Sequence, residues 1–301
     1  MNKEIAKRIL LLSVVCYAVV MVGLNIIRVY TDKGIKLGVY DPSDSFNTTT
    51  EIVLQNEYFD WNVDTSKVDS ALDAIFLSKR TPIISLEPWP VREDINNKDY
   101  LKTILQGKYD AKIIAFCKTV SSYKSPVYLR WGHEMELKNS RYFWANKNAT
   151  DFIQSYRYFV DLCRKSGDTI QFIWSPAGDK GLENYWPGAE FVDVIGVTVY
   201  SYDKWDKMNY GYQRSFNEIF NEKYTRVKVY NKPVYISEVG VTGTSEYRFQ
   251  WLTDAKKNFD NYPLLKAFVY FNAVDIEGVW GVDVDTPVWE IEPHVFVDIF
   301  K

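Results

Sequence analysis

The sequence has 301 residues, enough for one large domain or two ordinary ones. Its net charge is −3 and its basic residues are scattered, which argues against the basic face of a nucleic-acid-binding protein. Three cysteines fit no zinc spacing and no dense disulfide framework, so the composition points to no metal site.

The N-terminal segment predicts a membrane anchor. Residues 9–27 form an uncharged run that follows a basic stretch. At about 1.5 Å per residue this run spans the hydrocarbon core of a bilayer, and the positive flank favours a cytoplasmic N-terminus. No small-residue cleavage site follows. We therefore expect residues 1–30 to be a cytoplasmic stub and a single-pass signal anchor, with a cleaved signal peptide as the alternative. Either way, residues 31–301 face the outside of the cell.

Eight short apolar runs follow in residues 31–301. They lie at 35–40, 51–55, 82–86, 126–131, 170–174, 192–200, 233–237 and 267–271. Most are continuously apolar rather than alternating, which is typical of parallel strands covered on both faces. Because helical patterns fill most of the gaps, we predict one (β/α)8 barrel domain that follows the anchor.

The helical patterns differ in quality. One stripe contains Phe152, Tyr156, Phe159 and Cys163, with Thr150 or Asp151 as the expected N-cap. Similar stripes lie at Val68, Leu72 and Ile75, and at 113–120, whereas 41–50 is too short and polar for a full first helix. Cys117 and Cys163 both fall in helical patterns. There we expect buried free thiols, with a bridge between them as the alternative.

In such a barrel the active site lies at the carboxyl ends of the strands. Carboxylates, a histidine and aromatic residues collect at these ends. They are Glu87 and Trp89 after strand three, Arg130, His133 and Glu134 after strand four, Trp174 on strand five, Tyr200 on strand six and Glu238 on strand seven.

Glu134 and Glu238 are the strongest catalytic candidates. The tops of strands four and seven face a common centre, and retaining glycosidases need two carboxyl groups about 5–5.5 Å apart. One of the two must be protonated and the other ionised. For either glutamate alone, a helix cap or a surface ion pair is the commoner explanation. Two glutamates at strand ends of one barrel, with aromatic residues beside them, are poorly explained in that way.

Five ordered segments resemble glycoside hydrolase family 26, the β-mannanase family of retaining barrels. Residues 130–135 (RWGHEM) are similar to its acid/base segment, and 232–240 (KPVYISEVG) to its nucleophile strand. The other three are 84–89, 172–176 and 193–200. The resemblance implies Glu134 as general acid/base and Glu238 as nucleophile, His133 at the sugar that is attacked, and Tyr200 bonded to the nucleophile.

The remaining expectations concern substrate contacts. Arg130 would keep Glu238 ionised, and Glu87, Trp89, Trp174 and Trp280 would contact sugar. Trp144 either stacks on sugar or belongs to the core. The chain departs from the family at Glu136 and Leu137, where an Asn-Gly pair is usual, and in Tyr270-Phe271, where Trp-Phe is common. These departures leave the sugar open among β-mannan, β-glucan and an exopolysaccharide.

Other functions fit the sequence less well. No second histidine stands at the spacing of a zinc protease, and neither a G-x-S-x-G elbow nor a phosphate-binding glycine loop occurs, so we expect no cofactor. A non-catalytic carbohydrate-binding barrel is the alternative from another class. An anchored hydrolase could also act on the cell's own exopolysaccharide, beside the machinery that makes or exports it.

Overall fold

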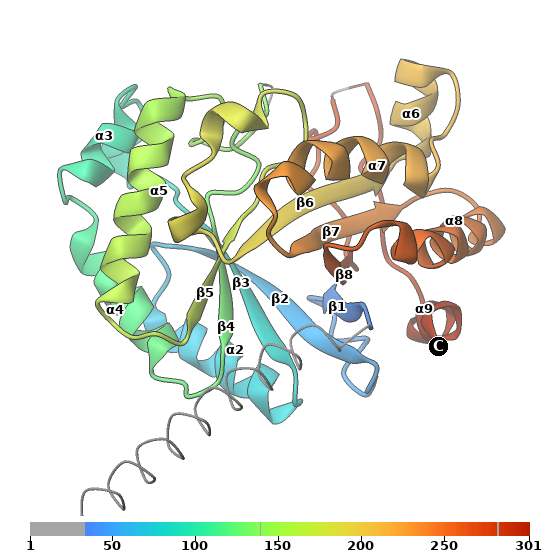
Figure 1. The fold of residues 1–301 in the computed structure, drawn as a ribbon, viewed down its shortest axis with the longest axis horizontal. Coiled ribbons are helices and arrows are strands. Elements are labelled where there is room, and N and C mark those ends of the chain that lie inside the picture. Colours follow the sequence, from blue (N-terminus) through green and yellow to red (C-terminus); the bar gives the residue numbers. More distant parts are fainter. Residues whose placement is uncertain (1–33, 139, 282) are drawn as a thin grey trace, which may run out of the picture. The chain divides into compact units, whose positions relative to one another are not determined.

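The computed structural model describes residues 34–138, 140–281 and 283–301, and its unit Lys36–Lys301 is built on a closed barrel (Figure 1). Eight parallel strands pair in chain order, and β8 pairs with β1 to close the barrel. The strands are β1 Lys36–Tyr40, β2 Ile52–Asp60, β3 Thr81–Glu87, β4 Val127–Trp131, β5 Ile170–Trp174, β6 Val194–Ser201, β7 Val234–Val241 and β8 Leu265–Phe271. The predicted (β/α)8 barrel is confirmed.

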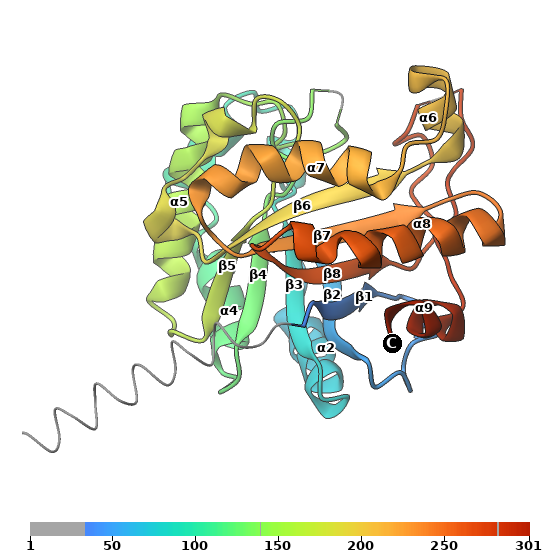
Figure 2. The ribbon, with the colours of Figure 1, turned by 45° about the vertical axis from the view of Figure 1, so that its right-hand side comes forward.

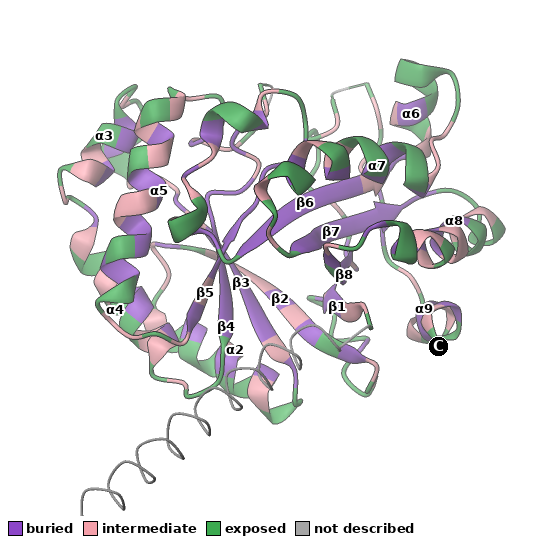
Figure 3. Cartoon of the chain, in the orientation of Figure 1, coloured by how far each residue is buried: buried purple, intermediate pink, exposed green. Residues whose placement is uncertain are grey.

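The helices surround the strands (Figures 1 and 2). They are α2 Thr65–Leu77, α3 Tyr100–Leu105, α4 Asp110–Ser121, α5 Ala149–Arg164, α6 Asp203–Tyr210, α7 Phe216–Val227, α8 Ser245–Asn258 and α9 Pro293–Phe300. Short 3-10 turns are η1 Arg92–Asp94, η2 Leu182–Tyr185, η3 Ala189–Phe191, η4 Lys228–Tyr230 and η5 Phe259–Asn261. Figure 3 shows buried strands and helices that are exposed on their outer sides. The predicted anchor at residues 9–27 lies outside the described residues. In the part of the chain that is described, no helix is long and apolar enough to cross a membrane.

Most helical expectations hold. The four residues of the α5 stripe are buried. No helix forms between β1 and β2, as the short and polar segment 41–50 predicted. There the Asp41 carboxylate instead holds a turn by accepting the Phe46 N–H at 2.7 Å. The α5 N-cap was wrongly placed, because Asn148 is the residue whose side chain accepts the Asp151 N–H.

The barrel interior changes from apolar to polar along the six strands β2 to β7. One buried layer holds Leu54, Ile83, Tyr128, Ile173, Val194, Tyr235, Ala267 and Val269. Alternate residues of a strand face the same side. Two positions further along, the interior therefore receives Asn56, Ser85, Arg130, Ser175, Gly196 and Ser237. Gly196 is required at this level, because a Cβ there would lie 2.4 Å from Ser237 Oγ and 2.5 Å from Ser175 Oγ.

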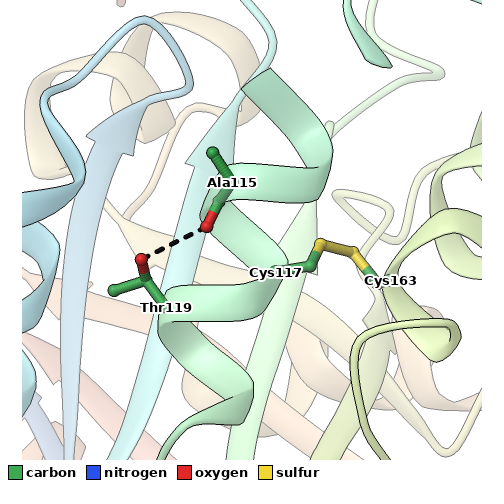
Figure 4. Close-up of a disulfide and its surroundings, with 4 residues drawn as sticks. All are labelled: Ala115, Cys117, Thr119 and Cys163. Atoms are coloured by element: carbon green, nitrogen blue, oxygen red, sulfur yellow. Dashed lines mark hydrogen bonds between the residues drawn. A yellow bond between two sulfur atoms is a disulfide. The ribbon is translucent and has the colours of Figure 1, made fainter. Parts of the chain in front are cut away.

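A disulfide joins α4 to α5 (Figure 4). It links Cys117 and Cys163, whose Cα atoms are 5.0 Å apart, and both residues are fully buried. The expectation of free thiols is therefore wrong. The pattern of either helix shows only that its cysteine faces inward, whereas the bond depends on the two helices being neighbours around the barrel.

Candidate active site

A cleft of about 1160 Å³ opens at the carboxyl ends of the strands. Among the residues predicted for the site, Glu87, Glu134, Tyr200, Glu238 and Trp280 line it. His133 and Arg130 are fully buried and do not line it. The two glutamates predicted to act together therefore share one cavity.

Glu238 reaches the barrel interior because β7 contains a bulge. Ile236 pairs with Val197 of β6, but the next pair is Glu238 with Thr198, so Ser237 is an extra residue. Without the bulge, strict alternation would turn Glu238 away from the interior face that Tyr235 and Ser237 occupy. The extra residue lets Ser237 and Glu238 both face inward.

Two side chains hold the Glu238 carboxylate. The Arg130 guanidinium lies with Nη1 2.5 Å from Oε1, and the Tyr200 hydroxyl donates to Oε2 at 2.7 Å. Arg130 is itself fixed, because its Nε donates to Ser175 Oγ at 2.8 Å. Burial acts to lower the pKa of Arg130, but the charge of Glu238, together with Tyr58, Glu134 and the hydrogen bond to Glu238, gives a net upward shift. This cation stabilises the ionised form of its partner.

The surroundings of Glu134 differ from those of Glu238. After β4 the backbone takes left-handed conformations at Gly132 (φ 58°) and Glu134 (φ 54°), which is a strained position for a residue with a Cβ. The Glu134 N–H donates to the Ser175 carbonyl at 2.8 Å, which fixes this turn. Burial and then the charge of Glu238 raise the pKa of Glu134 to about 8, although Arg130 opposes this shift.

Glu136 ties the turn after β4 to the loop after β5. Its Oε1 accepts the backbone N–H groups of Gly178 at 2.9 Å and Asp179 at 3.0 Å. The side chain is buried, and burial raises its pKa. The ends of β4 and β5 are thus joined at Arg130, Glu134 and Glu136. The sequence marked Glu136 only as a departure from the family pattern.

His133 and Glu87 lie close together at the ends of β4 and β3. His133 Nε2 is 3.9 Å from Glu87 Oε1, and no described residue bonds either ring nitrogen of His133. Burial, followed by the charges of Arg130 and Arg141, lowers the pKa of His133 well below its usual value. A neutral imidazole at this place can accept or donate a hydrogen bond to a hydroxyl group. Trp89 lies behind Glu87 and donates to its Oε2 at 2.8 Å rather than lining the cleft.

The tryptophans divide into two groups. Trp280 lines the cleft, and its indole N–H donates to Asp275 at 2.8 Å. Trp144 is fully buried and donates to the His133 carbonyl, so it belongs to the core. Trp174 is also fully buried, and it packs edge-on against the stacked rings of Trp186 and Tyr230. The expectation that Trp174 contacts sugar is corrected, because its neighbours Ile173 and Ser175 take the interior side of β5.

Several cleft residues escaped the sequence reasoning. Tyr58 of β2 accepts a bond from Arg130 Nη1 at 3.4 Å, Tyr142 packs on His133 with ring centres 4.6 Å apart, and Asp275 binds two indoles. Tyr58 was missed because β2 was expected to end at residue 55. Alternation continued from Leu54 would have placed it at the rim.

The arrangement suits acid–base and nucleophilic chemistry at one centre. A protonated carboxyl group at Glu134 can give a proton, and an ionised one at Glu238 can attack or stabilise a cation. Within the described ranges no group of three or more His, Cys, Asp or Glu could hold a metal ion.

Solved structures show the same fold. A GH26 β-mannanase from Bacteroides ovatus aligns with a TM-score of 0.63 at 15% identity, covering 90% of this chain and 88% of that one. GH26C from Muricauda sp. aligns with a TM-score of 0.65 at 15% identity, covering 91% and 87%.

Curated relatives are more similar in sequence but much longer. Endoglucanase H of Acetivibrio thermocellus is 25% identical over 264 residues, which are 80% of this chain and 28% of that protein. The β-1,3-xylanase TXYA of a Vibrio species is 25% identical over 227 residues, 63% of this chain and 45% of that protein. The chain therefore spans less than half of each. The profile of glycosyl hydrolase family 26 matches residues 89–274, well over half of the sequence. The chain belongs to glycosyl hydrolase family 26.

Proposed function

We propose that this protein is a retaining glycosidase that hydrolyses a β-linked polysaccharide by double displacement. The observation that carries the proposal is the unequal state of two carboxyl groups in one cleft. Glu238 is paired with the Arg130 cation, whereas the pKa of Glu134 is raised to about 8. In the proposed mechanism Glu134 therefore carries the catalytic proton at neutral pH.

In the first step Glu238 Oε bonds to the anomeric carbon while Glu134 gives its proton to the departing glycosidic oxygen. The Tyr200 hydroxyl and Arg130 hold the attacking carboxylate in place. In the second step Glu134, now ionised, takes a proton from water, and the resulting hydroxide displaces Glu238 from the sugar. The anomeric configuration is inverted twice and thus retained.

A polymeric β-linked substrate is supported by two kinds of observation. The cleft is large and carries aromatic side chains on its walls. Named relatives and structural neighbours include an endoglucanase, β-1,3-xylanases and a β-mannanase. Neutral β-glucan, β-mannan and β-xylan are therefore the first substrates to test, together with the producing cell's own exopolysaccharide.

Azide rescue tests the roles of the two glutamates. Glu238→Ala should lose all turnover, and azide should restore it only by forming a glycosyl azide of inverted configuration. Glu134→Ala should still cleave aryl glycosides with good leaving groups, and azide should give the retained product.

Serine substitution of a surface residue such as Glu246, which lies on the outer helix α8, provides a matched control. Wild-type rates of polymer hydrolysis in both alanine variants would overturn the assignment. Binding of polysaccharide without hydrolysis by the parent would favour the non-catalytic barrel instead.

We further propose that the barrel acts outside the cytoplasm, held to the cell membrane by residues 9–27. The disulfide between Cys117 and Cys163 supports an oxidising compartment, because such bonds persist mainly outside the cytosol. Protein from cell fractions should be found in the membrane with an intact N-terminus. A mature chain that begins near residue 30 would show that the segment is cleaved, and the enzyme would then be secreted.

A further inference from the structure

One side of the cleft takes no part in the proposed steps. Trp205 and Tyr210 of α6, together with Arg214 in the segment that follows, line the same cleft as Glu134 and Glu238. We call these three residues the α6 wall. In Figure 1, α6 lies beyond the carboxyl end of β6.

Arg214 in the α6 wall is held by a buried acid. Asp206 is fully buried, and it accepts both the Arg214 N–H at 3.1 Å and Arg214 Nε at 2.8 Å. Ser201 adds a third contact, since its hydroxyl donates to the Arg214 carbonyl at 3.1 Å. The guanidinium carbon consequently lies 4.1 Å from the Tyr210 ring centre and 5.6 Å from that of Trp205.

The Arg214 guanidinium also has hydrogen-bond donors that no described residue uses. Only Nε of the Arg214 side chain bonds to another of the described residues, and 18% of the side chain is exposed. The terminal Nη1 and Nη2 groups are thus available to an acceptor in the cleft. Because Asp206 balances the charge, these donors suit neutral hydroxyl oxygens.

An aromatic row connects the α6 wall to the catalytic centre. Tyr200, which bonds Glu238, lies with its ring centre 5.8 Å from Trp280. Trp280 lies 5.8 Å from Trp205, and Trp205 lies 5.8 Å from Tyr210. A chain of sugars that leaves the catalytic centre on this side would therefore meet aromatic rings continuously as far as Tyr210.

We propose that the α6 wall is a sugar-binding subsite for a neutral pyranose of the same polymer, away from the bond that is cleaved. The aromatic rings of Trp205 and Tyr210 offer faces for the apolar C–H surface of the sugar. The Arg214 Nη groups donate to its hydroxyl oxygens. This inference rests on the proposed function, because it assumes that the cleft holds a polysaccharide.

Kinetics on substrates of different length test the subsite. Trp205→Ala and Tyr210→Ala should each raise KM for the polymer about tenfold, the size expected when one aromatic contact is lost. The effect should shrink as the substrate is shortened to an aryl disaccharide. Tyr212→Ala is the matched control, since Tyr212 is half-exposed nearby but bonds Glu218 and does not line the cleft. Equal KM changes on long and short substrates would overturn the proposal.

Binding without turnover separates this proposal from the catalytic one. In the Glu238→Ala background, soluble polysaccharide in a native gel should retard the protein, and Trp205→Ala should reduce that retardation. If retardation depends on Trp205 although the parent hydrolyses nothing, the subsite stands and the catalytic proposal fails. The opposite outcome is that the parent hydrolyses polymer, whereas adding Trp205→Ala or Tyr210→Ala to Glu238→Ala does not weaken binding. The subsite is then wrong and the catalytic proposal stands.

Discussion

The carboxyl ends of β4 and β7 present the same side chain to one cleft in contrasting surroundings. On β7, Glu238 is paired with a buried guanidinium and accepts the Tyr200 hydroxyl. On β4, Glu134 sits on a left-handed turn, and burial raises its pKa to about 8. Residue type therefore does not decide which glutamate carries the proton. The surroundings do: Glu134 is buried, whereas Glu238 is paired with a cation that comes from β4 itself, four residues before Glu134.

Removing the cation should have the largest effect on this contrast. Arg130→Met would leave Glu238 buried without its partner, which should lower the free energy of unfolding by roughly 3–5 kcal/mol. We also expect kcat to fall by about two to three orders of magnitude, because the attacking carboxylate is no longer held or kept ionised. Urea unfolding and steady-state kinetics would measure the two effects.

Arg164→Met is the control for that variant, since Arg164 is exposed and bonds only the Glu190 carbonyl in the described structure. A kcat for Arg130→Met within a few-fold of the parent would show that Glu238 needs no cation.

The pH dependence should reveal the proton on Glu134. The proposed mechanism requires that proton, so kcat/KM should fall about tenfold per unit as pH rises above about 8. The sign for stability follows from the same shift. Between the usual pKa of 4.5 and about 8, the folded protein holds a proton that the unfolded chain has lost. The free energy of unfolding therefore falls as pH rises through this range.

Glu134→Gln should remove this part of the pH dependence of stability, and denaturant titrations at pH 5 and pH 9 would measure it. An alkaline limb of kcat/KM near pH 4.5 in the parent would contradict the assignment of the acid.

A smaller effect is expected where Glu238 accepts its hydrogen bond. Tyr200→Phe removes one bond to a charged group, worth about 1.5–3 kcal/mol, and should lower kcat by at least about tenfold. Tyr58→Phe should lower it less, because the hydrogen bond that Tyr58 accepts from Arg130 is long, at 3.4 Å. Equal losses in the two variants, measured on an aryl glycoside, would indicate that both hydroxyls act only on general packing.

The smallest expected effect comes from Glu136. Glu136→Gln keeps an oxygen for the Gly178 and Asp179 N–H groups but removes a charge that helps to raise the pKa of Glu134. The alkaline limb of kcat/KM should move down by about a few tenths of a pH unit. Glu136→Ala should also lose about 1–3 kcal/mol of stability, because the buried Gly178 N–H and the partly buried Asp179 N–H lose their acceptor. If the alkaline limb of kcat/KM does not move in Glu136→Gln, the charge of Glu136 is screened from Glu134.

Sequence reasoning located all eight strands because their apolar runs are continuous and helical stripes separate them. It also placed Glu134 and Glu238 at the same rim. It misjudged Trp174, since the final residue of a strand faces inward or outward according to register, and register is set by pairing with neighbours. It could not foresee that Glu238 depends on a bulge at Ser237, because a bulge leaves no mark in the apolar pattern. The pairing of Cys117 with Cys163 likewise depends on which helices are adjacent.

The disulfide has a consequence for the resistance of the protein to proteolysis. Its two cysteines are 46 residues apart, and the covalent ring that they close contains β4 and the rim residues Arg130, His133 and Glu134. Arg141, within the same ring, is exposed and offers a site for a trypsin-like enzyme. A cut there would leave both new ends covalently attached through α4 and α5. The nicked protein would remain one molecule, with Arg130 and Glu134 on one side of the cut and Ser175, which bonds both, on the other.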